Sequence, residues 1–300
     1  MPKPRKKSCI PIIIFVVFII VGVLIMLYPV ICNFINSQSS QQVIKSYSTS
    51  ISSYDKSRYD ALLQSAIDYN SKLSGTTVVD AFSTGDDSES QEYNNILNIS
   101  DTGIMGYIEI PKIDVKIPIY HGTSTKVLQR GAGHLKDSSF PVGGSSTHAI
   151  LAGHRGLPTS RLFTDLNQLK VGDLFYIYIL DKTLAYQVDK IQIVEPSNVE
   201  PLRLQEGKDY VTLVTCTPYA VNTHRLLVRG TRVEYKKEVL ENIHVENKAS
   251  TADIIFYIGL AIALIIIILV IIISRKIKKK STKMNIPVNC DNKQEVLEVI

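Results

Sequence analysis

Two long apolar runs divide the chain into a short start, a large middle and a short end. The first run covers residues 10–32 and the second covers residues 254–273. A hydrocarbon core about 30 Å thick needs roughly 20 apolar residues of helix, so each run is long enough to span a membrane. Basic residues gather on the outer sides of both runs, within the tails 1–9 and 274–300. The positive-inside rule therefore predicts a cell-membrane protein with both termini in the cytoplasm and the middle segment outside the cell.

A cleaved signal peptide is the alternative interpretation of the first run. The apolar core of a signal peptide covers about 7–15 residues and is followed by a small-x-small cleavage site. The run at 10–32 is longer than this, and no such site follows it. We therefore expect this helix to stay in the chain as an anchor.

Between the two runs, the spacing of apolar positions changes its period. In the first part, residues 33–102, apolar side chains recur at helical spacing, which predicts one or two amphipathic helices between 34 and about 74. A stretch rich in Gly, Ser and Asp follows at 74–90, where neither a helix nor a strand is expected. A short helix is predicted at 93–97. This part is interpreted as a helical appendage.

From residue 103 to 236 the pattern changes to short β-rich runs separated by turns. The predicted strands cover residues 107–110, 115–120, 148–152, 174–180, 184–194, 210–216 and 225–235. A helical insertion is expected at 160–170 and a hairpin loop at 181–183. Seven or eight short strands with one helix favour a mainly β fold, a closed or nearly closed barrel. A linker at 237–253 would connect this barrel to the second membrane run.

The net charge of +5 does not describe the middle segment. The chain has 33 Lys and Arg and 28 Asp and Glu, but eleven of these bases and only three of the acids lie in the two terminal tails. The segment between them is left with 22 basic and 25 acidic residues. This slightly acidic balance argues against nucleic-acid binding.

One cysteine, Cys216, lies between the two membrane runs. Cys9 and Cys32 lie at the ends of the first run and Cys290 lies in the C-terminal tail, so none is placed to pair with it. A lone thiol outside the cell is a candidate for reactivity, although a single buried cysteine is often an inert apolar side chain. A predicted strand ends on Cys216 and the next begins with Arg225. If the two strands form a hairpin, both residues lie at the same end of the sheet.

A nucleophilic thiol needs a nearby cation and an acid–base group. A neighbouring cation lowers the thiol pKa from its free value of about 8.5, and Arg225 could also bind an oxyanion or a substrate carbonyl. His154 ends a β run before a Gly-containing loop and is the best candidate for the acid and base. Spacing alone leaves this choice open, because other histidines stand nearby: His121, His134, His148 and His224. Their irregular spacing argues against zinc, so we expect no metal and no cofactor.

The motifs around these residues resemble those of sortases, the membrane-bound cysteine transpeptidases of Gram-positive bacteria. The run Thr-Leu-Val-Thr-Cys at 212–216, followed nine residues later by Arg225, is similar to the signature of that family. The pilus-assembling class C branch in particular is resembled by the strings at 108–113, 118–123, 131–135 and 217–230. The resemblance covers about 103–235. It implies an eight-stranded sortase β-barrel with catalytic places for Cys216, His154 and Arg225, and many class C members also have a membrane helix at each end.

Class C sortases also carry a lid, a loop across the active site with an Asp-Pro-aromatic motif. The matching positions in this chain are Asp80, Ala81 and Phe82. The resemblance implies that Asp80 pairs with Arg225 and that Phe82 lies over Cys216. Alanine in place of proline removes a fixed φ angle, so a more mobile loop than in relatives is expected. The alternative is an ordinary flexible linker.

The resemblance implies a specific reaction. The enzyme would attack the Thr-Gly bond of an LPXTG-like sorting signal with Cys216 and hold the pilin as a thioacyl intermediate. A lysine of the next pilin would resolve it into an isopeptide bond, with His154 as general acid and base and Arg225 on the oxyanion. The expected partners are pilin or surface proteins with C-terminal sorting signals, and the membrane.

Three alternatives remain open from the sequence. The first is a sortase that anchors surface proteins to a cell-wall precursor, against which the lid motif argues only in part. The second is a non-enzymatic, membrane-tethered β-barrel binding module, and the third is a hydrolytic cysteine peptidase. Selective reaction of Cys216 with a thiol reagent at neutral pH would separate the enzymes from the binding module.

Overall fold

The computed structural model describes residues 10–73, 79–83, 91–99 and 103–240, with scattered helical positions between 257 and 275. The chain forms two compact units, residues 1–26 with 251–300, and residues 27–250. Most of the second predicted membrane run, both basic tails and most of the predicted linker lie outside the described residues. They remain predictions.

The first helix, α1, covers Ile10–Ser52 and is much longer than the predicted membrane run. Its N-terminal part is long and apolar enough to cross a membrane, and the side chains described there are exposed, as a lipid-facing helix requires. The amphipathic segment that follows the apolar run is a continuation of the same helix rather than a separate one. A membrane-anchoring helix at the start of the chain is therefore supported.

Two further helices, α2 at Lys56–Ser71 and α3 at Gln91–Asn95, join the barrel core. The Asp55 side chain caps α2 by accepting a hydrogen bond from the backbone N–H of Arg58, which explains where this helix begins. Asn70 then exchanges two hydrogen bonds with the backbone of Phe140, 3.1 Å to its carbonyl and 2.7 Å from its N–H. The predicted appendage is thus helical, and it is packed on the barrel as part of one domain.

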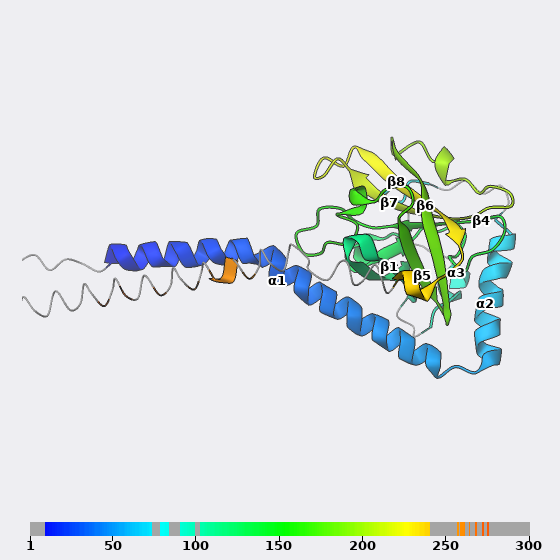
Figure 1. Ribbon diagram of the computed structural model, residues 1–300, viewed down its shortest axis with the longest axis horizontal. Coiled ribbons are helices and arrows are strands. Elements are labelled where there is room, and N and C mark those ends of the chain that lie inside the picture. The colour runs from blue at the N-terminus through cyan, green and yellow to red at the C-terminus, as the bar shows by residue number, and fades with distance from the viewer. Residues whose placement is uncertain are drawn as a thin grey trace, which may run out of the picture. The chain divides into compact units, whose positions relative to one another are not determined.

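Eight strands form the closed barrel seen in Figure 1. They are β1 Ile104–Ile110, β2 Val115–His121, β3 Ala132–His134, β4 Thr147–Ala152, β5 Leu174–Ile179, β6 Lys182–Val194, β7 Asp209–Thr217 and β8 His224–Val233. Their order around the barrel is β1-β2-β3-β4-β7-β8-β6-β5. The β2–β3 and β4–β7 pairs are parallel and the others antiparallel. The predicted mainly β, eight-stranded barrel is confirmed.

Two local predictions were wrong. Residues 160–170 hold only a 3-10 turn at Leu166–Gln168 instead of a helix. The apolar spacing there reflects a loop folded onto the core, in which Leu162 and Phe163 are buried. The hairpin loop expected at 181–183 is shorter, because β6 already begins at Lys182. The sequence pattern also missed β3, which has three residues, and the short helix α4 at Thr125–Leu128.

The alternation of side chains along β7 separates two apolar clusters. Val211 and Leu213 point into the main barrel core, whereas Val214 belongs to a second cluster on the other face of the sheet. That second cluster combines buried residues from several elements: Ala81, Leu128, Leu135, Ile150, Ala152, Leu202, Val214 and Leu227. Since side chains alternate along a strand, Cys216 lies on the same face as Val214.

Candidate active site

The end of β7 lies between β4 and β8, and both neighbours supply a candidate residue. On β8, Arg225 is the direct antiparallel partner of Cys216. On the other side, the parallel pairing of β4 with β7 places Ala152 opposite Val214. β4 ends at Ala152, and the chain that leaves it stays bonded to β7, because the Gly153 N–H donates to the Val214 carbonyl. The structure therefore pairs Cys216 directly with Arg225 and places His154 in the segment that leaves the neighbouring strand.

Gly153 holds this arrangement in place where β4 ends. Its N–H donates to the Val214 carbonyl at 3.0 Å, and its own carbonyl accepts from the Thr215 hydroxyl at 2.7 Å. A Cβ at this position would lie 2.6 Å from the Phe163 ring, so no larger residue fits without displacing that ring. The backbone before His154 is therefore locked to the strand that carries the thiol.

Arg155 is a site residue that the sequence analysis missed. Its Nη1 donates to the Thr217 hydroxyl at 2.9 Å and its Nε to the Thr164 carbonyl at 3.1 Å. These bonds tie the loop after His154 to the residue after Cys216. The sequence did offer a signal for this residue, because Arg155 directly follows His154 and the pair stands between two glycines.

The lid residues cover this end of the sheet. Both carboxylate oxygens of Asp80 accept from Arg225, at 2.8 Å from Nε and 2.7 Å from Nη2, and the two side chains are only 16% and 11% exposed. The ring of Phe82 lies 5.1 Å from the Arg225 guanidinium carbon and 5.9 Å from the His154 ring, measured to ring centroids. Phe82 thus packs on both Arg225 and His154.

Ala81 gives the lid a contact that the sequence analysis did not predict. It is 1% exposed and packs in the second apolar cluster with residues of β4, β7 and β8. The methyl group therefore adds burial where a proline would add stiffness. The Asp80 carbonyl also accepts from the N–H and the hydroxyl of Ser83, which closes a turn around Ala81 and Phe82.

The electrostatics of the closed site favour neutral side chains. Burial raises the pKa of the Cys216 thiol, the positive charge of Arg225 lowers it in part, and the negative charge of Asp80 raises it further. Burial also lowers the pKa of His154. With the lid in place, the thiol and the imidazole are therefore both biased toward their uncharged forms.

Three other histidines have structural partners. His134 is fully buried, with its ring nitrogens bonded to the Tyr93 hydroxyl and the Ser139 carbonyl, and burial lowers its pKa to about 3. His148 is bonded to the Arg203 carbonyl and the Thr212 hydroxyl, and burial lowers its pKa to about 4. The third of them, His121, contacts two backbone carbonyls.

No three His, Cys, Asp or Glu side chains lie close enough to hold a metal ion within the described ranges.

Comparison with known proteins gives a consistent answer. A family model described as a sortase domain matches residues 108–233. The crystal structure of Streptococcus pneumoniae sortase C, whose title refers to pilin substrate specificity, is 45% identical. It superimposes with a TM-score of 0.62 and covers 65% of this chain and 98% of that one. Sortase C1 of Streptococcus agalactiae is 50% identical, with a TM-score of 0.61 and coverage of 65% and 100%.

Curated relatives of other sortase classes match over a shorter stretch. Sortase D of Bacillus subtilis is 31% identical over 131 residues, which are 43% of this chain and 63% of the relative. Sortase A of Bacillus anthracis is 33% identical over 133 residues, 44% of this chain and 61% of the relative. The chain thus spans somewhat over three fifths of the length of these two relatives.

Proposed function

Because this chain belongs to the sortase family of cysteine transpeptidases, with class C sortases as its structural neighbours, we propose that it joins pilin subunits through lysine isopeptide bonds. Support for the proposal comes from the direct pairing of Cys216 with Arg225, from His154 just after the neighbouring strand β4, and from the contacts that Asp80 and Phe82 make with Arg225. Two structural relatives described above are sortases C, and the structure of one of them was described for its pilin substrate specificity. These facts favour pilin assembly over attachment to a cell-wall precursor.

In the first half-reaction, the Cys216 thiolate attacks the threonine carbonyl of an LPXTG-like sorting signal. Arg225, released from Asp80 when the lid opens, stabilises the negative charge on the carbonyl oxygen. The Thr-Gly bond breaks, and His154 donates a proton to the leaving glycine amine. The pilin remains on the enzyme as a thioester, and the C-terminal tail leaves.

In the second half-reaction, a lysine amine of the next pilin attacks the thioester carbon. His154 accepts the proton from this amine, the carbon–sulfur bond breaks, and the thiolate is regenerated. One peptide bond is exchanged for one isopeptide bond, so no cofactor or energy source is needed. Both termini in the cytoplasm and the barrel outside the cell complete the proposed topology.

The thioacyl step can be tested by mass spectrometry. The full chain in detergent is mixed with a sorting-signal peptide, with and without a lysine-bearing pilin domain, and the mass on each cysteine is determined. We expect an acyl adduct on Cys216 that is consumed only when the acceptor amine is added. In Cys216→Ala the adduct and the product both disappear, whereas Cys32→Ala, which removes the other described free thiol, leaves them unchanged.

Two outcomes would contradict the proposal. Product formation by Cys216→Ala above background would remove the nucleophile assignment. An adduct that reacts with a cell-wall precursor amine but never with the pilin lysine would leave a sortase of the wall-anchoring kind.

A further inference from the structure

The long helix α1 touches the barrel at two different heights. Beyond the apolar run, the Asn33 side chain accepts a hydrogen bond from the Arg161 N–H at 3.0 Å, and the Asn36 side chain donates to the Thr159 carbonyl at 3.1 Å. Further along the same helix, the Tyr47 hydroxyl also binds the barrel. All of these residues belong to the compact unit 27–250. The contacts lie along the part of α1 that follows the apolar run.

Asn33 marks the end of the apolar run. The run ends at Cys32, and Asn33 is the first of several polar residues that follow it. A hydrocarbon core takes about 20 residues of helix, so a helix anchored by this run has Asn33 at the boundary with the headgroups. The loop at 159–161, which is hydrogen-bonded to Asn33 and Asn36, is held at the same boundary.

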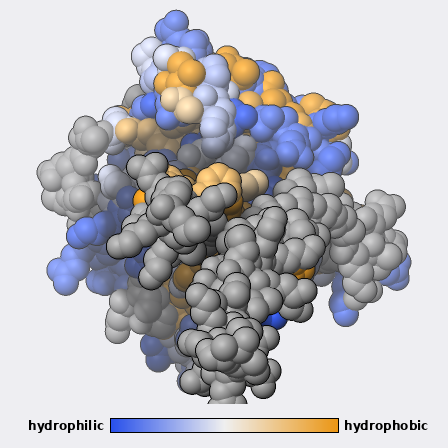
Figure 2. Space-filling model, turned by 90° about the vertical axis from the view of Figure 1, so that its left-hand side faces the viewer, coloured by the Kyte–Doolittle hydropathy of each residue, from blue (hydrophilic) through white to orange (hydrophobic). Residues whose placement is uncertain are grey.

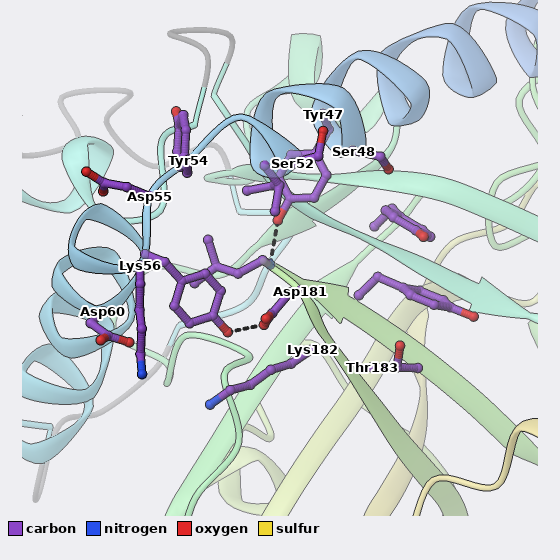
Figure 3. Close-up of a pocket in the computed structure, with 15 residues that line it drawn as sticks. Tyr47, Ser48, Ser52, Tyr54, Asp55, Lys56, Asp60, Asp181, Lys182 and Thr183 are labelled. Atoms are coloured by element: carbon purple, nitrogen blue, oxygen red, sulfur yellow. Dashed lines mark hydrogen bonds between the residues drawn. The ribbon is translucent and has the colours of Figure 1, made fainter.

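The second contact lies farther from that boundary. Tyr47 is eleven residues after Asn36, which is about 16 Å along a helix at 1.5 Å per residue. Its hydroxyl donates to the Met105 carbonyl at 3.0 Å and accepts from the Leu180 N–H at 2.7 Å. Figure 3 shows the bond to the backbone next to Asp181. The Asp181 carboxylate also accepts a hydrogen bond from the Tyr59 hydroxyl. The turn between β5 and β6 is thus held by Tyr47, in the C-terminal part of α1, and by Tyr59 of α2.

These two contacts fall at opposite ends of β6. Its last residue, Val194, pairs with Arg225, the partner of Cys216, so this end belongs to the active site. Its first residue, Lys182, follows the β5–β6 turn. A strand of 13 residues is about 40 Å long. The loop at 159–161 is on the active-site side, because Arg155 bonds the same loop to the end of β7.

We propose that Asn33 and Asn36 hold the active-site end of the barrel against the phospholipid surface, with the β5–β6 turn directed away from it. This rests on the proposed function and on α1 as the anchor, and it applies to a substrate whose sorting signal is itself held at the membrane by an apolar helix. Cys216 then faces the layer in which that signal is held. The enzyme and its substrate then meet by diffusion within the membrane, and the barrel does not have to reorient before Cys216 reaches the sorting signal.

The loop after Cys216 exposes two apolar side chains, Tyr219 at 55% and Val221 at 63%. Figure 2 shows hydrophilic and hydrophobic side chains next to one another on the described part of one face. Small scattered patches are ordinary for a water-exposed surface. The side-chain amides of Asn33 and Asn36 therefore orient the barrel, while the apolar run supplies the membrane affinity.

The orientation can be measured on the full chain in lipid vesicles. The native cysteines at positions 9, 32, 216 and 290 are replaced by serine, and one new cysteine is introduced at an exposed site, either Pro158→Cys or Lys182→Cys. Each is labelled with the same fluorophore and placed in phosphatidylcholine–phosphatidylglycerol vesicles that carry a headgroup spin label. We expect strong quenching at position 158 and little at position 182. The double change Asn33→Ala with Asn36→Ala should reduce this difference.

A matched control and an activity readout separate positioning from folding. Gln38→Ala with Gln41→Ala changes two exposed polar residues of the same helix and should leave the quenching unchanged. In chains with Cys216 intact, the Asn33 and Asn36 double variant should cleave a membrane-anchored sorting signal about tenfold more slowly, a small part of what a fixed tether can contribute. It should cleave the same signal without its apolar helix at the rate of the unaltered chain.

Equal quenching at positions 158 and 182, or stronger quenching at 182, would overturn the proposed orientation. So would a double variant that loses rate on both substrates equally. Failure of the proposed function appears differently, as an unaltered chain that forms no acyl adduct on Cys216 with either substrate. The quenching measurement reports the orientation of the barrel whether or not the chain forms this adduct.

Discussion

The ion pair between Asp80 and Arg225 makes a quantitative prediction about access to Cys216. In Asp80→Asn the side chain keeps its shape but loses its charge. Two charge-assisted hydrogen bonds, of 2.7 and 2.8 Å, become at best weak neutral ones. The lid then keeps the burial of Ala81 and the packing of Phe82. We expect the closed form to be weakened, not abolished.

The size of the effect follows from the geometry. A hydrogen bond to a charged group contributes about 1.5–3 kcal/mol, and residual exposure of 11% and 16% reduces what a pair of them provides. We take about 2 kcal/mol for the loss of the charge, which is about a 30-fold change in the fraction of open lid at 1.4 kcal/mol per tenfold. Because a reagent reaches the Cys216 thiol only when the lid is open, alkylation should become faster by the same factor.

The assay uses the full chain in detergent with its other three cysteines replaced by serine. Alkylation of Cys216 by iodoacetamide at neutral pH is followed by mass spectrometry. The barrel offers a matched control, because Asp189 makes a similar two-bond ion pair with Arg229, at 3.0 and 2.8 Å. Asp189→Asn should leave the alkylation rate unchanged. If Asp80→Asn reacted no faster than the unaltered chain, the lid would not limit access, and residues 80–82 would be a linker that happens to touch the barrel.

Three further outcomes are expected. His154→Ala should lower the rate of peptide cleavage by about 10² to 10⁴, the usual range for a general acid–base group. His134→Ala should lower the melting temperature and leave the cleavage rate per folded molecule unchanged. Equal rate losses in the two folded variants would refute the assignment of His154. The alkylation rate of Cys216 should keep rising above pH 8.5, where an exposed thiol is half ionised, because burial and Asp80 raise its pKa. Asp80→Asn should move this profile to lower pH, and an identical profile would contradict the electrostatic argument. Gly153→Ala should cost about 1–3 kcal/mol of unfolding free energy by overpacking against a buried ring, which a denaturant titration measures.

Local pattern was sufficient for much of the barrel. Strand positions follow from a period of two along single segments, and seven of the eight strands were visible in that way. The hairpin of β7 and β8 also follows from the sequence, because a short loop joins adjacent strands. The juxtaposition of Cys216 and Arg225 was therefore predictable. The exceptions were the three-residue strand β3 and the loop at 160–170, whose apolar residues have helical spacing but pack on the core from an irregular backbone.

Other parts of the site depended on contacts between distant segments. The strand before His154 lies beside the strand that carries Cys216 only through the parallel pairing of β4 and β7, which are 62 residues apart and separated by β5 and β6 along the chain. No periodicity encodes such a pairing, and the motif resemblance supplied the choice among histidines. The lid is 145 residues from Arg225 in sequence, and the burial of Ala81 became apparent only in the folded chain.

The sequence by itself determined the β-rich barrel segment, the apolar runs and the thiol with its neighbouring arginine, because each is written in residues close together along the chain. Tertiary structure decided which strands lie beside that thiol, what holds residues 80–82 on the barrel, and where α1 contacts the barrel. These depend on pairing and packing between segments far apart in sequence, where a few hydrogen bonds and buried side chains choose one arrangement among many that the local pattern allows equally.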